Sequence, residues 1–166
     1  MVGVKGPPIP APEPVERGAI RRFVQAIMDP DPLYSDESYA ISRFGFVVAP
    51  PLFPLHACDP SCRQPLGSAD PLEPALTDPD FDGAGVSIGV WNVDVGLARQ
   101  LNGGNDVDIF DLARVGDLIV SQSEIIDIYQ KEGKTGPMVF IITETTFKAA
   151  NRDSLLLKSR QTDIRR

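Results

Sequence analysis

The sequence predicts one α+β domain, and two observations support this fold class. Helical periodicity is confined to the early part of the 166-residue chain, whereas from about residue 86 the chain divides into segments rich in β-branched and aromatic residues. A chain of this length can bury one apolar core but is too short for two ordinary domains. Helices followed by long hairpins are typical of a helix packed on one face of an antiparallel sheet, and a buried helix wrapped by a strongly curved sheet fits this pattern.

Two helices are expected in the first 45 residues. The apolar residues between positions 16 and 28 have the i, i+3, i+4, i+7 spacing of an amphipathic helix. The DPDP run at 29–32 ends this helix, because proline removes a backbone donor and clashes with the preceding turn. A second helix is expected to begin around Ser35, whose hydroxyl can cap it, and to end at Gly45. The residues of the apolar stripe are Ile20, Phe23, Val24 and Ile27.

Three further segments complete the early part of the chain. Residues 1–14 carry five prolines and no hydrophobic period, so we expect an extended or disordered arm, with the folded domain at 15–166. The segment FGFVVAPPLFPL is apolar, but its adjacent prolines exclude a central strand, and we expect a buried turn that leads into a short helix. Residues 56–85 are rich in Pro, Asp and Gly; a loop of this length is either a lid over a binding site or a passive insertion.

The remainder of the chain predicts an antiparallel sheet. Its segments contain the β-branched and aromatic residues typical of strands, and turn residues separate the later ones at 133–137 and 151–154. The expected strands span 86–95, 105–113, 117–131, 137–148 and 154–165.

Composition narrows the class of protein. A formal charge of -7 disfavours binding to nucleic acid or to an anionic membrane surface. The sequence has no basic N-terminal region ahead of an apolar run and no apolar stretch of membrane-spanning length, so we expect a cytoplasmic protein. His56, Cys58 and Cys62 offer three soft ligands, but a structural zinc site needs four, so we expect no metal and no other cofactor.

Four blocks of sequence resemble the MaoC-like hydratases, in particular the N-terminal MaoC or fatty-acid-synthase-like dehydratase domains. The resemblance implies a single hot-dog fold, in which a curved antiparallel sheet wraps a central helix. It also implies an acyl-coenzyme A or acyl-carrier-protein ligand and assembly through paired hot-dog units. The blocks are ERGAIRRFVQAIMDPDPLYSDESYA, VVAPPLFP, LNGGNDVDIFDLARVGDLI and IYQKEGKTGPMVFIITETTF.

The sequence departs from the family at one informative position. Active members carry an aspartate followed five residues later by histidine, in a segment similar to GDxNPLH. The matching stretch here is MDPDPLY, with Asp29 at the aspartate position and Tyr34 in place of the histidine. Hydration of an enoyl thioester needs a base for water and an acid for the α carbon, and a phenol with a pKa of about 10 is a weak base at pH 7. His56 could replace the missing imidazole only from a segment that does not resemble the catalytic motif.

These observations lead to one function and two alternatives. We expect a substrate-binding, non-catalytic subunit of a heteromeric enoyl-CoA hydratase or 3-hydroxyacyl thioester dehydratase, whose catalytic MaoC-type partner supplies the Asp/His pair. The alternatives are a self-sufficient hydratase or thioesterase that acts through Asp29, and a non-enzymatic acyl-thioester binding protein. No residue is expected to be catalytic unless Asp29 acts alone. The expected substrate contacts are Tyr34, Ala49, Pro50, Phe53, Asn102, Gly103 and Gly104, although Asn-Gly is also a hairpin signal and the apolar residues could be plain core.

Overall fold

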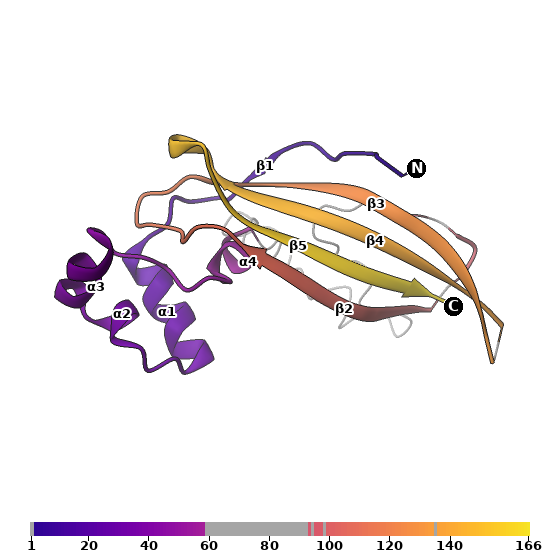
Figure 1. Cartoon of the computed structure of the whole chain (residues 1–166), viewed down its shortest axis with the longest axis horizontal. Coiled ribbons are helices and arrows are strands. Elements are labelled where there is room, and N and C mark those ends of the chain that lie inside the picture. The colour runs from indigo at the N-terminus through magenta and orange to yellow at the C-terminus, as the bar shows by residue number, and fades with distance from the viewer. Residues whose placement is uncertain (1, 59–92, 94, 98, 135) are drawn as a thin grey trace, which may run out of the picture.

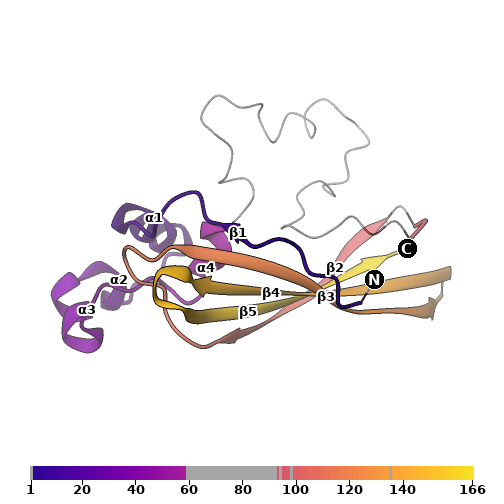
Figure 2. The same ribbon diagram turned by 90° about the horizontal axis from the view of Figure 1, so that it is seen from above.

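The computed structural model describes residues 2–58, 93, 95–97, 99–134 and 136–166. Figure 1 shows a long curved sheet with α1, α2 and α3 gathered at one end, beside the loop that joins β2 to β3. Figure 2 shows α1 and α4 on the same side of the sheet, whereas α2 and α3 lie beyond its end. This arrangement confirms the α+β class and the hot-dog fold.

The first helix, α1 (Arg17–Ile27), follows the predicted amphipathic stripe. Ile20 and Val24 are buried, whereas Ile27 at the end of the stripe is exposed. Met28 ends the helix in the left-handed conformation, with φ of 54°. The left-handed region is strained for any residue with a Cβ, so the chain holds Met28 in an unfavourable backbone conformation.

Aspartates cap the next two helices. Asp31 accepts a hydrogen bond from the Leu33 amide at the start of α2 (Pro32–Ser35), and Asp36 accepts one from the Tyr39 amide at the start of α3 (Glu37–Phe44). The prediction that Ser35 caps the second helix was therefore wrong. An aspartate one residue later caps equally well, and the DPDP run both ends α1 and begins a short helix with proline in its first turn. Gly45 ends α3 as expected, with φ of 77°.

The sheet has five antiparallel strands in the order β1-β3-β4-β5-β2. β3, β4 and β5 are long strands that follow one another in the sequence and pair as two successive hairpins. β2 pairs with β5 at one edge of the sheet, and β1 pairs with β3 at the other. The strands are β1 (Ile9–Pro10), β2 (Gln100–Ile109), β3 (Ile119–Gly133), β4 (Gly136–Ala149) and β5 (Ser154–Arg165).

The last three predicted strands agree with β3, β4 and β5 within a few residues. The strand expected at 105–113 begins earlier, at Gln100, and ends at Ile109. Most of the strand expected at 86–95 and most of the loop expected at 56–85 lie outside the described residues, and so does Cys62.

The apolar core lies between the helices and the end of the sheet that they cover. Phe53 and Cys58, at either end of α4 (Phe53–Ala57), are buried in one cluster with the α1 stripe and with Phe147 and Leu157 of the sheet. This short helix fulfils the prediction of a buried turn leading into a helix. The sequence also predicted a central helix wrapped by the curved sheet. Within the described residues, α4 is the only part of the chain that corresponds to this helix.

Candidate functional site

A cavity of about 580 Å³ lies between α1, α2 and α3. Its floor is apolar because the buried stripe of α1 faces Ala40 of α3, which is 1% exposed, and Val47 of the following segment. Asp29 and Tyr34, which occupy the positions of the family's catalytic pair, both line it. An apolar floor with polar groups that can orient a ligand is the usual form of a small-molecule site. The polar and charged lining residues here are Arg17, Arg21, Gln25, Asp29, Tyr34, Ser35, Asp36 and Glu37. Its apolar lining residues include Ile20, Val24, Met28, Leu33, Ala40 and Val47.

Asp29 is engaged by the local backbone. Its Oδ1 accepts a hydrogen bond of 3.0 Å from the Asp31 amide, and Asp31 in turn caps α2 through the Leu33 amide at 2.8 Å. The two aspartates therefore form consecutive turns that fix the path from α1 to α2. One carboxylate oxygen of Asp29 thus has a structural role in the wall of the cavity.

Tyr34 is half-buried in the cavity wall, in the second turn of this segment. Burial, followed by the negative charges of Asp29 and Asp31, raises the pKa of the Tyr34 phenol above its ordinary value. All three causes disfavour the phenolate, so the hydroxyl stays protonated at neutral pH. Tyr34 can therefore donate a hydrogen bond to a ligand but cannot act as a base there.

An ion pair closes one side of the cavity. The guanidinium of Arg17 at the start of α1 donates two hydrogen bonds to the carboxylate of Glu37 at the start of α3, and both residues line the cavity. The hydrogen bond from Arg17 lowers the pKa of Glu37. Both side chains are exposed, so the pair orients the two helices at the rim without contributing much stability.

Three of the expected substrate contacts lie in or beside the core. Ala49 is 0% exposed and Phe53 is 2% exposed, and both belong to the main apolar cluster. Pro50, which follows Ala49 in the sequence, is also buried. None of the three is among the residues that line the cavity. A contact of these three residues with substrate therefore remains a prediction.

Asn102, Gly103 and Gly104 form a β-bulge rather than a hairpin. The pairing of β2 with β5 shifts between Asn102 and Asn105, and the Asn102 side chain accepts a hydrogen bond of 2.8 Å from the Gly104 amide. A Cβ on Gly103 would lie 2.9 Å from the Thr162 side chain, so glycine permits the close approach of β5. None of these three residues is among those that line the cavity with Asp29 and Tyr34, so the structure does not bring the two groups together.

His56 lies outside the cavity that contains Asp29 and Tyr34. It is exposed on α4, and its ring packs against Phe23 with centroids 5.4 Å apart. It lines a smaller hollow of about 210 Å³, together with Glu13 and Glu16. Within the described part of the chain it contacts aromatic rings and forms no hydrogen bond with either glutamate. This placement gives no support for His56 as a substitute for the imidazole missing at position 34.

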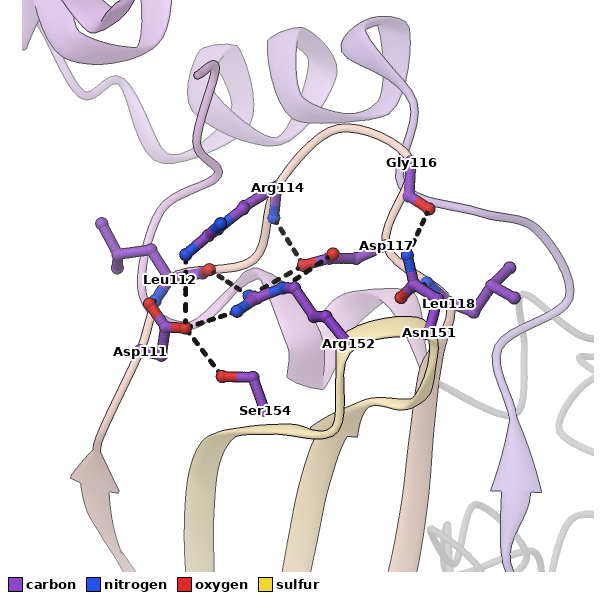
Figure 3. Close-up of polar contacts among 9 residues, drawn as sticks. All are labelled: Asp111, Leu112, Arg114, Gly116, Asp117, Leu118, Asn151, Arg152 and Ser154. Carbon is purple, nitrogen blue, oxygen red and sulfur yellow. Dashed lines mark hydrogen bonds and ion pairs between the residues drawn. The ribbon is translucent and has the colours of Figure 1, made fainter. Parts of the chain in front are cut away.

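A partly buried ionic network connects the loop between β2 and β3 with the turn between β4 and β5 (Figure 3). Arg152, in the turn between β4 and β5, donates to Asp117 at 2.9 and 3.0 Å and to Asp111 at 2.5 Å. Asp117 also accepts the Arg114 amide at 2.8 Å, which fixes the loop between β2 and β3. This loop pairs with the segment below the cavity, because the Val115 amide donates to the carbonyl of Val47.

Comparison with known proteins identifies the family. A family described as "FAS1-like, dehydratase domain region" matches residues 1–154. The chain belongs to this FAS1-like dehydratase family. The match confirms the resemblance to the fatty-acid-synthase-like branch of MaoC-like proteins. A curated relative from Thermobifida fusca (strain YX), named UPF0336 protein, is 28% identical over 127 residues, which cover 75% of this chain and 68% of the relative.

Solved structures share the fold of this FAS1-like dehydratase domain. A chain of the ChsH1-ChsH2 complex from Mycobacterium tuberculosis superposes with a TM-score of 0.70 at 21% identity, over 97% of this chain and 83% of that one. A MaoC-like dehydratase from Rhodospirillum rubrum has a TM-score of 0.61 at 19% identity, over 100% and 94%. At these identities the likeness establishes the hot-dog fold alone. Among the described residues, no helix is long and apolar enough to cross a membrane.

Sequence reasoning identified Asp29 and Tyr34 but missed most of the cavity around them. The α1 stripe was interpreted as core, although Ile20 and Val24 also face the cavity. The partnership of Arg17 with Glu37 was missed because 20 residues separate them and no local motif connects them.

Proposed function

We propose that this FAS1-like dehydratase domain is the substrate-binding, non-catalytic subunit of a heteromeric enoyl-thioester hydratase or 3-hydroxyacyl-thioester dehydratase. The observation that carries the proposal is the state of Tyr34. A phenol lies where proton transfer requires an imidazole, and its surroundings raise its pKa further from neutrality.

The chemistry of hydration explains why this matters. Addition of water to a 2-enoyl thioester needs a base near neutral pKa, an acid for the α carbon and donors for the enolate oxygen. Asp29 provides one carboxylate, which the Asp31 amide already engages, and Tyr34 provides only a donor. The cavity can therefore bind an acyl chain on its apolar floor and lacks an evident proton shuttle.

A catalytic partner follows from this incomplete set of groups. The partner we propose is a MaoC-type hot-dog subunit that retains the Asp/His pair. The ChsH1-ChsH2 complex supports this form of assembly, because a chain of that two-component complex has the same fold. The ligand we propose is an acyl thioester of coenzyme A or of an acyl carrier protein.

The test compares the lone chain with the co-expressed pair. Hydration of a series of 2-enoyl-coenzyme A esters, and of the same acyl groups on a carrier protein, is followed by the loss of the enoyl-thioester absorbance. We expect turnover by the complex and none by the lone chain. Appreciable turnover by the lone chain would refute the non-catalytic role.

Two tyrosine variants provide a matched control within the complex. Tyr34→Phe removes a hydroxyl that lines the cavity, whereas Tyr39→Phe removes one on α3 that lies outside it. If Tyr34 donates one hydrogen bond of about 1 kcal/mol to the ligand, its loss should raise KM roughly fivefold and leave kcat and the pH-rate profile unchanged. Tyr39→Phe should change neither constant. A large fall in kcat for Tyr34→Phe would show that the phenol takes part in the chemistry.

A self-sufficient hydratase or thioesterase is the alternative that the presence of Asp29 in the cavity favours. Asp29→Asn separates the two functions, because it should abolish turnover in a self-sufficient enzyme and leave a partner complex largely active. The third possibility, an acyl-thioester binding protein with no hydratase partner, predicts that pull-down from the native source recovers no hot-dog subunit with the Asp/His pair.

A further inference from the structure

The N-terminal arm, defined here as residues 2–14, runs along the outer edge of β3. The amides of Gly3, Gly6 and Ala11 donate to the carbonyls of Ile125, Ser123 and Ile119 at 2.7 to 2.8 Å. Side chains add to this pairing, since Lys5 forms an ion pair of 3.2 Å with Glu124 and Gln122 donates to the Gly6 carbonyl. The arm therefore covers the edge of β3 from Ile119 to Ile125.

Residues of the arm alternate between two orientations. Ile9 is paired with Ser121, and the amides of Ala11 and Val15 donate toward the β3 side, to the carbonyls of Ile119 and Asp117. In an antiparallel pair, the residues between these positions direct their backbone nitrogens away from the partner strand. β1 itself spans only Ile9–Pro10, and the positions just before Ile9, Ala11 and Val15, together with the position after Ala11, are all prolines. All four prolines are exposed. They are Pro8, Pro10, Pro12 and Pro14.

The chemistry of proline makes this alternation significant. A strand that added to the outer side of the arm would need amide donors at those four positions, and proline has none. None of the residues whose amides donate to β3 or to the loop before it, Gly3, Gly6, Ala11 and Val15, is a proline. The spacing of two residues thus removes donors from one side of the strand and preserves them on the other.

We propose that the alternating prolines make the arm a one-sided strand, which pairs with β3 on its inner side and prevents any further strand from pairing on its outer side. An exposed sheet edge with free amides and carbonyls is a template for self-association. Beyond the arm, the pairing of β3 with β4 shifts between Ile125 and Asp127, and a bulge also discourages edge pairing. β2 then remains as the long edge of the described sheet that carries no neighbouring strand. This inference does not depend on the proposed hydratase function.

The test restores the missing donors. A variant with Pro8→Thr, Pro10→Thr, Pro12→Thr and Pro14→Thr adds four outward amides and raises β propensity. We expect its weight-average sedimentation coefficient to rise with protein concentration over a range in which the wild-type value stays constant. Hydrogen exchange should show that the β3 amides and the inner amides of the arm remain protected.

The control variant carries Ala11→Thr and Glu13→Thr. It adds the same side chain to the same arm between the prolines and leaves the four prolines in place, so it should sediment like the wild type. The proposal is supported only if the four-proline variant assembles while its arm stays protected and the control does not. Unchanged sedimentation of the four-proline variant, equal assembly of the control, or assembly that accompanies loss of arm protection would each overturn it.

Discussion

Arg152 offers the strongest test of how the cavity wall is supported. It donates four hydrogen bonds, to Asp117 twice, to Asp111 and to the Leu112 carbonyl. The side chain of Asp117 is 3% exposed, so Arg152→Met would leave a buried carboxylate with the Arg114 amide as its remaining described donor. Breaking a buried ion pair from one side costs about 3–5 kcal/mol. The Arg152 side chain is itself 20% exposed, which places the expected loss near the lower limit, at about 3 kcal/mol.

Urea denaturation measures this loss as a lower midpoint at unchanged slope. Lys158→Met is the matched control, because Lys158 pairs with Glu144 at 2.7 Å on a face where its own side chain is 34% exposed. A pair of that kind contributes at most about 1 kcal/mol. Combining Arg152→Met with Asp117→Asn should recover part of the loss, with a coupling energy above about 1 kcal/mol. A loss no larger than that of the control, or an additive double variant, would refute the reasoning.

Three further outcomes follow from particular residues. Met28→Gly should raise the free energy of unfolding by about 1 kcal/mol in urea denaturation, because glycine adopts a φ of 54° without strain. Ala40→Leu should lower the free energy of unfolding by about 1–3 kcal/mol, because Ala40 is 1% exposed and the added carbons crowd its neighbours, and should shorten the longest acyl chain that the complex turns over. The hydrogen bond from Lys158, opposed by burial and aided by Arg160, lowers the pKa of Glu144. The ionised Glu144 therefore stabilises the fold fully above its ordinary pKa of about 4.3, and this stabilisation is lost as the pH falls through the lowered pKa. Glu144→Gln should make the free energy of unfolding, measured by urea denaturation, depend less steeply on pH in the acid range.

The parts of the fold that sequence predicted well depend on local patterns. The alternation of apolar residues and the turn residues between strands define β3, β4 and β5, because each of these strands pairs with its neighbour in the sequence. The α1 stripe was equally readable, since helical periodicity is a local property. Asp29 and Tyr34 were found because they lie within one short motif of the family.

The parts that sequence missed depend on contacts between distant segments. Asp117 and Arg152 are 35 residues apart, and nothing near either residue indicates that a carboxylate is buried there. Gly103 was open to two interpretations because an Asn-Gly pair signals a hairpin in isolation. Its tertiary neighbour Thr162 on β5 determines the outcome, since the close approach of that strand requires glycine within a continuing strand.

The position of Tyr34 allows the cost of losing the imidazole to be estimated. A phenol with a pKa at or above about 10 is deprotonated in fewer than roughly one molecule in a thousand at pH 7, which corresponds to about 4 kcal/mol. Burial and the charges of Asp29 and Asp31 raise this pKa, so the cost in the cavity exceeds that figure. A base is effective when its pKa lies near the working pH. The pKa of the phenol is already too high, and the neighbours of Tyr34 raise it further. Asp29 and Asp31, whose charges add to the effect of burial on the pKa of Tyr34, also form the turns that lead into α2, so the fold of this segment opposes proton transfer by Tyr34.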